Sequence, residues 1–296
     1  MKRCFGLGSV LLGVLTACGG GAATSASNNS STQPVAQNAV VNLAGGIPQT
    51  YTQVWSEEFE TAGLPDATKW DYDTRQNKEG WWDGKLQYFG RARLENTRIE
   101  DGRLIIEARK ERVSSAADYG GQEYSSGSIT TRGQASWTYF ASETRAKVAC
   151  GKGLLSAIWM QSDTMTWPQD GEIDILESLG YAPDTIYSTI HTSAFNHKNG
   201  TQVGSQYTAS QACGEWHRYQ SLWTPEGLWI GMDDRWYFQF RNLYANDTTR
   251  WPFNQPFHFR LTLDVGGSWA GSQGVPDASF PARMEVDYVR VFQAPS

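Results

Sequence analysis

Residues 171–177 read Gly-Glu-Ile-Asp-Ile-Leu-Glu, and this stretch decides how the surrounding chain must fold. As a helix, its two glutamates would lie about 140° apart around the axis and could not act on one target. As a strand, alternation places Glu172 and Asp174 on one face but sends Leu176, rather than Glu177, to that face. A β-bulge at Ile175-Leu176 would absorb one residue and turn Glu177 back toward the other acids. The stretch therefore predicts a bulged strand with three carboxylates on one side.

Three like charges on one sheet face make each other harder to ionise. At least one of these acids should therefore hold its proton to a higher pH than a free glutamate does. Such a cluster supplies an acid beside a base. A solvated acidic strand face is the alternative, but the neighbouring Trp167, Pro168 and Gly171 and the apolar opposite face favour catalysis.

The 296-residue chain has 40% hydrophobic and 19% charged residues, enough for one large domain or two small ones. Its net charge of -6 and its lack of a basic run argue against a nucleic-acid partner. Short apolar or alternating runs are broken by Gly, Asn, Asp and Pro, and no long helical period competes with them. The clearest runs are 104–108, 128–131, 143–148, 185–190 and 286–291. The pattern predicts an all-β sandwich or barrel as one domain.

The residue types also indicate a chemistry. Paired carboxylates without a cofactor motif suggest hydrolysis of a glycosidic bond, in which one acid protonates the leaving oxygen and the other attacks or activates water. Four scattered histidines and few cysteines give no zinc-ligand spacing. The 13 tryptophans fit a cleft that stacks on sugar rings, although a large sandwich core also consumes tryptophan.

The N-terminus has the charged, apolar and small-residue order of a secretory signal. We expect 1–17 to be that signal, 18–46 a flexible tether with little to bury, and 47–296 the catalytic domain. The sequence Leu-Thr-Ala-Cys that ends the signal resembles the lipobox of bacterial lipoproteins, which implies a lipid on Cys18. An ordinary cleaved signal is the alternative. Gly19 favours display at the outer membrane of an exporting bacterium.

Two cysteines remain after export if Cys4 leaves with the signal and Cys18 carries lipid. Cys150 and Cys213 would then be the thiols of the mature domain in an oxidising compartment. A disulfide between them and two separate buried thiols are both open at this point.

Residues 167–177, Trp-Pro-Gln-Asp-Gly-Glu-Ile-Asp-Ile-Leu-Glu, resemble the active-site signature of glycoside hydrolase family 16, in the E-x-D-x-x-E form of its laminarinase and agarase branches. Further matching segments cover essentially 51 to 293, namely 54–59, 86–88, 95–96, 101–104, 124–127, 265–269 and 286–291. The resemblance implies a concanavalin-like β-jelly-roll of two antiparallel sheets with a concave cleft. It also implies retaining endo-hydrolysis of β-1,3-glucan without a catalytic cofactor.

Position by position, the resemblance makes Glu172 the nucleophile, Glu177 the general acid and then base, and Asp174 the neighbour that tunes the nucleophile. The implied sugar-binding residues are Trp167 as a floor, Asn96 for hydroxyls, His191 near the leaving group and Trp269 at the cleft border. Core packing or a structural role is the alternative for the two tryptophans and the histidine.

The resemblance also implies one structural calcium on the convex side, far from the chemistry. Glu58, Gly102 and Asp287 occupy the matching positions, and hard oxygen ligands suit calcium. For Asp287, a solvent-facing strand residue is the alternative.

Near the expected cleft the chain departs from the family pattern. Gly84-Lys85 replaces Asn-Glu, Leu155-Ser156 replaces Trp-Pro, and Ser128 replaces Arg. These changes affect substrate preference rather than catalysis. We expect a monomeric, lipid-anchored endo-β-1,3-glucanase whose partner is a polysaccharide. The alternatives are a family 16 hydrolase of mixed-linkage glucan, agarose or a related galactan, and a non-catalytic glucan-binding surface protein.

Overall fold

The computed structural model describes residues 43–244 and 246–295. The expected signal peptide, Cys18 and most of the expected tether lie outside these residues. The chain already pairs with a sheet at Leu43–Ala44, ahead of the domain start expected at residue 47. No helix within the described ranges is both long and apolar enough to cross a membrane.

The larger of two main sheets has nine strands, all paired antiparallel. In sheet order they are β1 (Leu43–Ala44), β16 (Arg235–Arg241), β15 (Gly227–Met232), β14 (His217–Thr224), β9 (Ala141–Lys147), β18 (Ala282–Gln293), β6 (Arg103–Ala108) and β5 (Thr97–Glu100), with β2 (Thr52–Glu57) also paired to β18.

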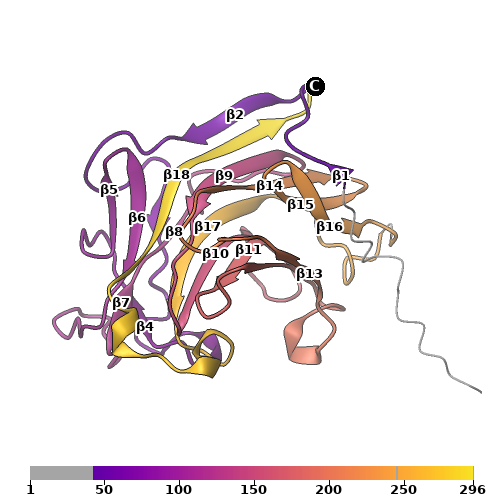
Figure 1. Cartoon of the computed structure of the whole chain (residues 1–296). Coiled ribbons are helices and arrows are strands. Elements are labelled where there is room, and N and C mark those ends of the chain that lie inside the picture. The colour runs from indigo at the N-terminus through magenta and orange to yellow at the C-terminus, as the bar shows by residue number, and fades with distance from the viewer. Residues whose placement is uncertain (1–42, 245, 296) are drawn as a thin grey trace, which may run out of the picture. The chain divides into compact units, whose positions relative to one another are not determined.

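The second main sheet has seven antiparallel strands and lies inside the curve of the first (Figure 1). In sheet order they are β13 (Val203–Thr208), β12 (Thr185–His191), β11 (Glu172–Leu179), β10 (Leu154–Ser162), β17 (Phe257–Val265), β8 (Ser128–Thr130) and β3 (Asp71–Tyr72). The remaining elements are a parallel pair, β4 (Gln87–Phe89) and β7 (Tyr124–Ser126), and four 3-10 turns, η1 (Trp82–Gly84), η2 (His197–Asn199), η3 (Ala270–Gln273) and η4 (Asp277–Ser279). The predicted all-β fold with two antiparallel sheets is confirmed. Strands β6, β12 and β18 contain three of the runs expected as strands, and β8 and β9 each end one residue before the expected end of theirs, at Thr130 and Lys147.

The core lies between the two sheets. Alternate residues of the seven-stranded sheet, such as Ile158, Met160 and Leu261, are fully buried in one apolar cluster with Ile230 and Phe238 of the nine-stranded sheet. Burying apolar faces of two sheets against each other is the main favourable term in such a sandwich. The other alternate residues of the seven-stranded sheet project away from the core.

One register row crosses this outward face from β11 to β3. Asp174 pairs with Trp159, Trp159 with Arg260, Arg260 with Thr130, and Thr130 with Asp71. Paired residues of antiparallel strands project to the same side, so all five side chains share the outward face. Four strand spacings of about 4.8 Å make the row about 19 Å long.

A disulfide joins Cys150 to Cys213, with their Cα atoms 5.4 Å apart and a sequence separation of 63. This resolves the two alternatives for these cysteines in favour of the bridge. Since Cys150 precedes β10 and Cys213 follows β13, the covalent loop contains β10 to β13.

Candidate active site

Strand β11 contains the predicted bulge. The β12 partners of Asp174 and Glu177 are only two residues apart, so the Ile-Leu pair 175–176 faces a single residue of β12. Both bulged side chains are buried in the core. As a result Glu172, Asp174 and Glu177 all line the same cleft. The expected common orientation of the three acids is confirmed.

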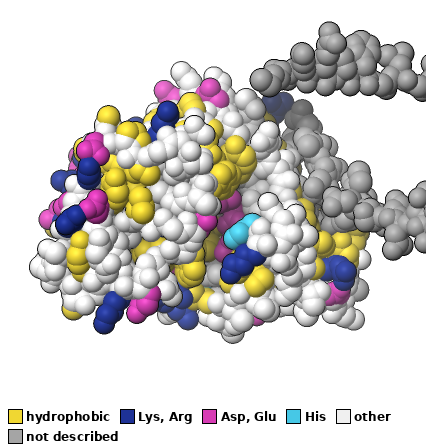
Figure 2. Space-filling view, turned by 90° about the horizontal axis from the view of Figure 1, so that it is seen from below, with side chains coloured by type: hydrophobic (Ala, Val, Ile, Leu, Met, Phe, Trp, Pro, Cys, Tyr) yellow, Lys and Arg dark blue, Asp and Glu magenta, His cyan; other side chains and the backbone are white. Residues whose placement is uncertain are grey.

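The cleft has a volume of about 840 Å³ and opens over the outward face of the seven-stranded sheet. Figure 2 shows acidic side chains within this hollow, with a histidine and basic side chains beside them and hydrophobic side chains around it. The loop carrying Asp83 and the loop carrying Ser268 form part of the wall. The Asp83 carboxylate accepts hydrogen bonds from Ser268 Oγ at 2.5 Å and Ser268 N at 3.1 Å, which ties the two loops together.

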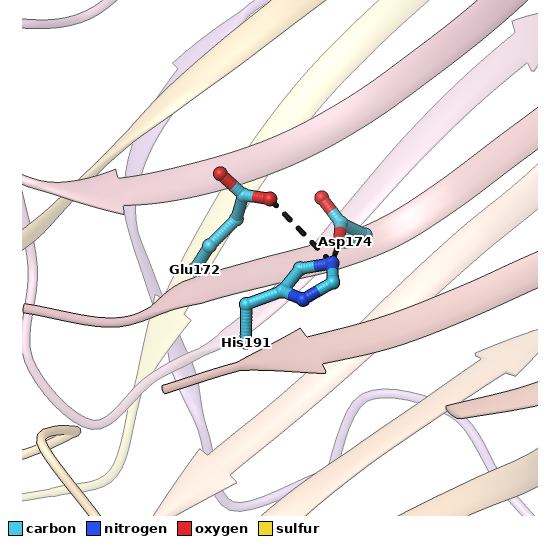
Figure 3. Close-up of side chains that lie close together, drawn as sticks. All are labelled: Glu172, Asp174 and His191. Atoms are coloured by element: carbon cyan, nitrogen blue, oxygen red, sulfur yellow. Dashed lines mark ion pairs between the residues drawn. The ribbon is translucent and has the colours of Figure 1, made fainter. Parts of the chain in front are cut away.

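His191 of β12 lies close to Glu172 and Asp174 (Figure 3). Its Nε2 lies 3.8 Å from Glu172 Oε1 and 3.4 Å from Asp174 Oδ2. This follows from strand pairing, because His191 is the direct partner of Glu172. One ligand atom from each of the three residues falls within 4.8 Å of the others, so this group could hold a divalent cation. Asp174 Oδ2 and His191 Nδ1 are buried and have no hydrogen-bond partner among the described residues.

The third acid has a different neighbour. Glu177 Oε2 accepts a hydrogen bond from the Thr189 hydroxyl at 3.2 Å. A neutral donor stabilises a carboxylate less than a cation does. The charges of His191 and Lys85 also act to lower the pKa of Glu177, as they do for Glu172.

Burial raises the pKa of all three acids, and repulsion by Asp174 adds to the shift of the two glutamates. Burial, with the charge of Asp174 as the next cause, raises the pKa of Glu172 to about 8 and that of Glu177 to about 8. Burial raises the pKa of Asp174 to about 8 as well. The cluster consequently retains protons at neutral pH, which gives it the capacity to donate one to a leaving group.

Lys85 is a cation within the same cleft, and it opposes these shifts. Its charge acts to lower the pKa of Glu172, Asp174 and Glu177. The Lys85 ammonium is held by Asp264 Oδ2 at 2.5 Å, and Asp264 Oδ1 also accepts a hydrogen bond from Gln87. The residue that departs from the family pattern thus lies close enough to influence the acids.

Two tryptophans expected in the sugar site line the cleft. The Trp167 ring lies 5.9 Å from the His191 ring and 5.0 Å from that of His197, and Lys198 Nζ lies 4.8 Å from its centre. Trp269 borders the cleft, is partly exposed, and contacts the Tyr187 ring edge-on at 5.0 Å. Both positions suit stacking on a sugar ring.

Asn96 is not in the cleft, which corrects the expectation that it binds sugar hydroxyls. Its side chain is 0% exposed and its Nδ2 donates to Glu107 O at 3.1 Å and to Ser125 Oγ at 2.8 Å. Its Oδ1 accepts from Arg93 at 2.6 Å. The amide is fully used in joining strands and has no free group for a substrate.

The expected calcium ligands do not fit a site built from side chains. Both Glu58 oxygens are paired with Arg290, at 3.0 and 2.7 Å, and Asp287 is paired with Arg145 at 2.6 Å. A cation there would have to displace these guanidinium groups or use backbone carbonyls such as that of Gly102. Calcium binding at Glu58, Gly102 and Asp287 stays a prediction.

Sequence reasoning missed Trp82 as a cleft residue. Both Trp82 and its neighbour Trp81 line the cleft, but Trp81 is 6% exposed and packs on Phe89, whereas Trp82 is 51% exposed. The signal in the sequence was the pair Trp81-Trp82, which lies just before Gly84-Lys85, where the chain differs from the family pattern. Nothing in the sequence distinguished which of the two indoles would face solvent.

The family profile for glycosyl hydrolases family 16 matches residues 91–290. The β-glucanase of Rhodothermus marinus is 46% identical over 249 residues, covering 81% of this chain and 84% of that protein. The glucan endo-1,3-β-glucosidase A1 of Niallia circulans is 30% identical over 257 residues, and the chain spans only 37% of its length.

One similar solved structure contains a bound sugar. It is a mutant of SCLam, a non-specific endo-β-1,3(4)-glucanase of family 16, with 1,3-β-D-cellobiosyl-glucose at its active site. It is 50% identical, has a TM-score of 0.84, and covers 86% of this chain and 99% of that one. The jelly-roll fold follows from these matches and the two antiparallel sheets. The chain belongs to glycosyl hydrolase family 16 and is a glycoside hydrolase.

Proposed function

We propose that this protein is a retaining endo-hydrolase of β-1,3-glucan that works by double displacement. The observation that carries the proposal is the β11 bulge, because it turns Glu177 into the same tryptophan-lined cleft as Glu172 and Asp174. Two carboxyl groups and a cleft that binds sugars are the requirements of this chemistry. Relatives named glucanases support the choice of substrate.

In the first step, Glu172 attacks the anomeric carbon while Glu177 gives its proton to the departing sugar oxygen. The glycosidic bond breaks and a glycosyl ester forms on Glu172. His191 Nε2, 3.8 Å from Glu172 Oε1, supports the ionised nucleophile. Glu177, with only the neutral Thr189 hydroxyl as hydrogen-bond partner among the described residues, is suited to hold the proton it must deliver.

In the second step, Glu177 takes a proton from water, and the water oxygen attacks the same carbon. The ester breaks, Glu172 is regenerated as a carboxylate, and the sugar keeps its original configuration. Asp174 lies between the two glutamates in sequence, and its charge disfavours ionisation of both. Asp174 thus helps to keep Glu177 protonated until the leaving group needs the proton.

The test is hydrolysis of laminarin followed by the masses and anomeric configuration of the first products. We expect mixed oligosaccharides in the β configuration from the wild type and intact binding without turnover from Glu172→Gln. Products of the α configuration would contradict retention. Release of single sugars alone from chain ends would contradict endo-cleavage.

Mixed-linkage glucan is the second candidate substrate, because the similar SCLam enzyme is described as a non-specific endo-β-1,3(4)-glucanase. The same product analysis with mixed-linkage glucan, agarose and a related galactan separates these cases. Cleavage of a galactan with no cleavage of β-1,3-glucan would overturn the first choice.

We also propose that the enzyme is a monomer exported to the outer membrane and held there by lipid on Cys18. The support is the sequence of the first 46 residues, with a signal-like start followed by a polar tether. In a bacterial host, Cys18→Ala should move the enzyme from the membrane to the soluble fraction. Fatty-acid labelling that is equal in both forms would contradict the anchor, and light scattering tests the monomer.

A further inference from the structure

A second pocket of about 520 Å³ lies at the far end of the same sheet face, over β17, β8 and β3. It shares Arg75, Met165 and Arg260 with the catalytic cleft, so the two hollows adjoin. The register row from Asp174 to Asp71 runs from the acids into this pocket. A chain of sugars that follows the sheet away from β11 would therefore reach the near wall of the pocket, at Arg260, after about 10 Å and its far wall, at Asp71, after about 19 Å.

Two residues of β17 on this side of the sheet each have one buried nitrogen without a hydrogen-bond partner among the described residues. His258 is 1% exposed, and its Nδ1 lies 3.0 Å from Asp163 Oδ1, while its Nε2 has no hydrogen-bond partner among the described residues. Arg260 Nε is also buried without one. Unsatisfied buried polar groups are rare in folded proteins, and two of them two residues apart on one strand face indicate a ligand.

The two groups have complementary roles. Burial lowers the pKa of His258 to about 4, so the ring is neutral at working pH. The Asp163 carboxylate favours the tautomer with a proton on Nδ1, which leaves Nε2 as an acceptor. Arg260 Nε is a donor. Sugar hydroxyls both donate and accept, and so they match this pair.

The charges of the pocket are largely neutralised internally. Arg91 pairs with Asp71, and both Arg75 and Arg260 pair with Asp73. This matching does not favour a strongly anionic ligand. Arg132 is exposed, lines the pocket, and forms no ion pair within the described part of the chain.

We propose that this pocket is a distal subsite that binds hydroxyl groups of a long neutral polysaccharide several sugars away from the bond that is cleaved. The inference rests on the proposed function and deepens it, because it assigns the enzyme a preference for long chains. His258 and Arg260 supply its buried polar groups and Arg132 an exposed donor, and the catalytic acids are untouched by it. His258 and Arg132 are the residues to test, because Arg260 also lines the catalytic cleft.

The experiment compares short and long substrates with two variants, His258→Phe and Arg132→Ala. His258→Phe fills the same space without the acceptor, and it leaves Asp163 partly in solvent, so folding is preserved. Arg235→Ala, at an exposed arginine of the nine-stranded sheet, is the matched control. The steady-state constants are measured on a tetrasaccharide and on the polymer of whichever glycan the wild type cleaves.

We expect each variant to raise KM for the polymer about three- to five-fold, as the loss of one hydrogen bond predicts, with kcat and the tetrasaccharide constants unchanged. The control should match the wild type on both substrates. An unchanged ratio of polymer to tetrasaccharide kcat/KM in folded variants would overturn the subsite. An equal loss on both substrates would overturn it as well. A wild type that cleaves a glycan other than β-1,3-glucan would instead contradict the proposed function, while the length comparison still decides on the subsite.

Discussion

Two sets of buried carboxylates in this molecule differ in what surrounds them. Glu107 of β6 is 1% exposed and pairs with three arginines, Arg98 at 3.0 Å, Arg283 at 2.8 Å, and Arg109. The acids of the cleft are also sheltered from water, but three of them share one lysine and one histidine. Burial alone does not mark a reactive group. The shortage of positive charge does, because it leaves protons available for transfer.

Replacing a cleft acid should remove activity and leave the fold intact. We expect Glu172→Gln to lower kcat about 10⁴-fold or more, as the loss of a nucleophile does in other enzymes, with no loss of stability. Reducing-end assays and urea unfolding measure the two effects. If Glu172→Gln were inactive because it is unfolded, Glu172 would be needed for stability, as Glu107 is, and the two kinds of buried carboxylate would not differ.

Stability should fall as pH rises, and the cleft acids should be the cause. Their pKa of about 8 in the folded protein lies above the unfolded values near 4, so the folded state binds more protons between these limits. Stability from this source is therefore present in acid and is lost progressively as pH rises from about 4 toward 8. Urea unfolding at pH 5 and pH 8 checks this.

The triple variant Glu172→Gln, Asp174→Asn, Glu177→Gln is the control for that pH dependence. Its unfolding free energy should vary less between the two pH values than that of the wild type. An identical slope in both proteins would assign the effect to other groups.

Glu107→Gln should lower stability and leave activity unchanged, the opposite of what we expect when a cleft acid is replaced. Removing the charge shared by three arginines should lower the unfolding free energy by about 2 kcal/mol, since two of those arginines are partly exposed and can be solvated. Activity per folded molecule should not change. A loss of kcat without a loss of stability would break the comparison.

Lys85 is the residue through which the supply of positive charge to the cleft acids can be changed directly. Lys85→Met should raise the pKa values of the acids, because the one lysine beside them is gone, and so move the acidic limb of the pH–rate profile to higher pH. Activity on the acidic side should fall about ten-fold, while Lys85→Arg should preserve the profile. The double variant Lys85→Met, Asp264→Leu avoids leaving Asp264 buried without a cation. An unshifted acidic limb in folded variants would exclude this role.

The fold and the orientation of the three acids could be predicted because both depend on local periodicity. Strand alternation gives the faces, and one surplus residue between Asp174 and Glu177 requires a bulge. The five expected strands are present for the same reason. Local pattern also identified the cysteines, although their pairing needed the positions of β10 and β13.

The remaining site features depend on contacts between distant segments. Lys85 and Asp264 are 179 residues apart, and no local pattern relates them. Asn96 resembled a sugar ligand, but its amide is hydrogen-bonded to Arg93, to Glu107 of β6 and to Ser125 of β7. No sequence motif marks His258 or the distal pocket. Their position next to the catalytic cleft depends on how five strands pair, which the local sequence does not show.

The Cys150–Cys213 bridge has a consequence for how this enzyme can be made. The covalent loop it closes contains the catalytic strand and its three neighbours in sequence, and closing 63 residues removes chain entropy worth about 4 kcal/mol in the unfolded state. In a reducing cytosol the bridge would not form, and the segment that carries the catalytic residues would lack this contribution to its stability. An oxidising compartment lets the bridge form, so the yield of active protein should follow the redox state of the compartment in which the chain is produced rather than the level of expression.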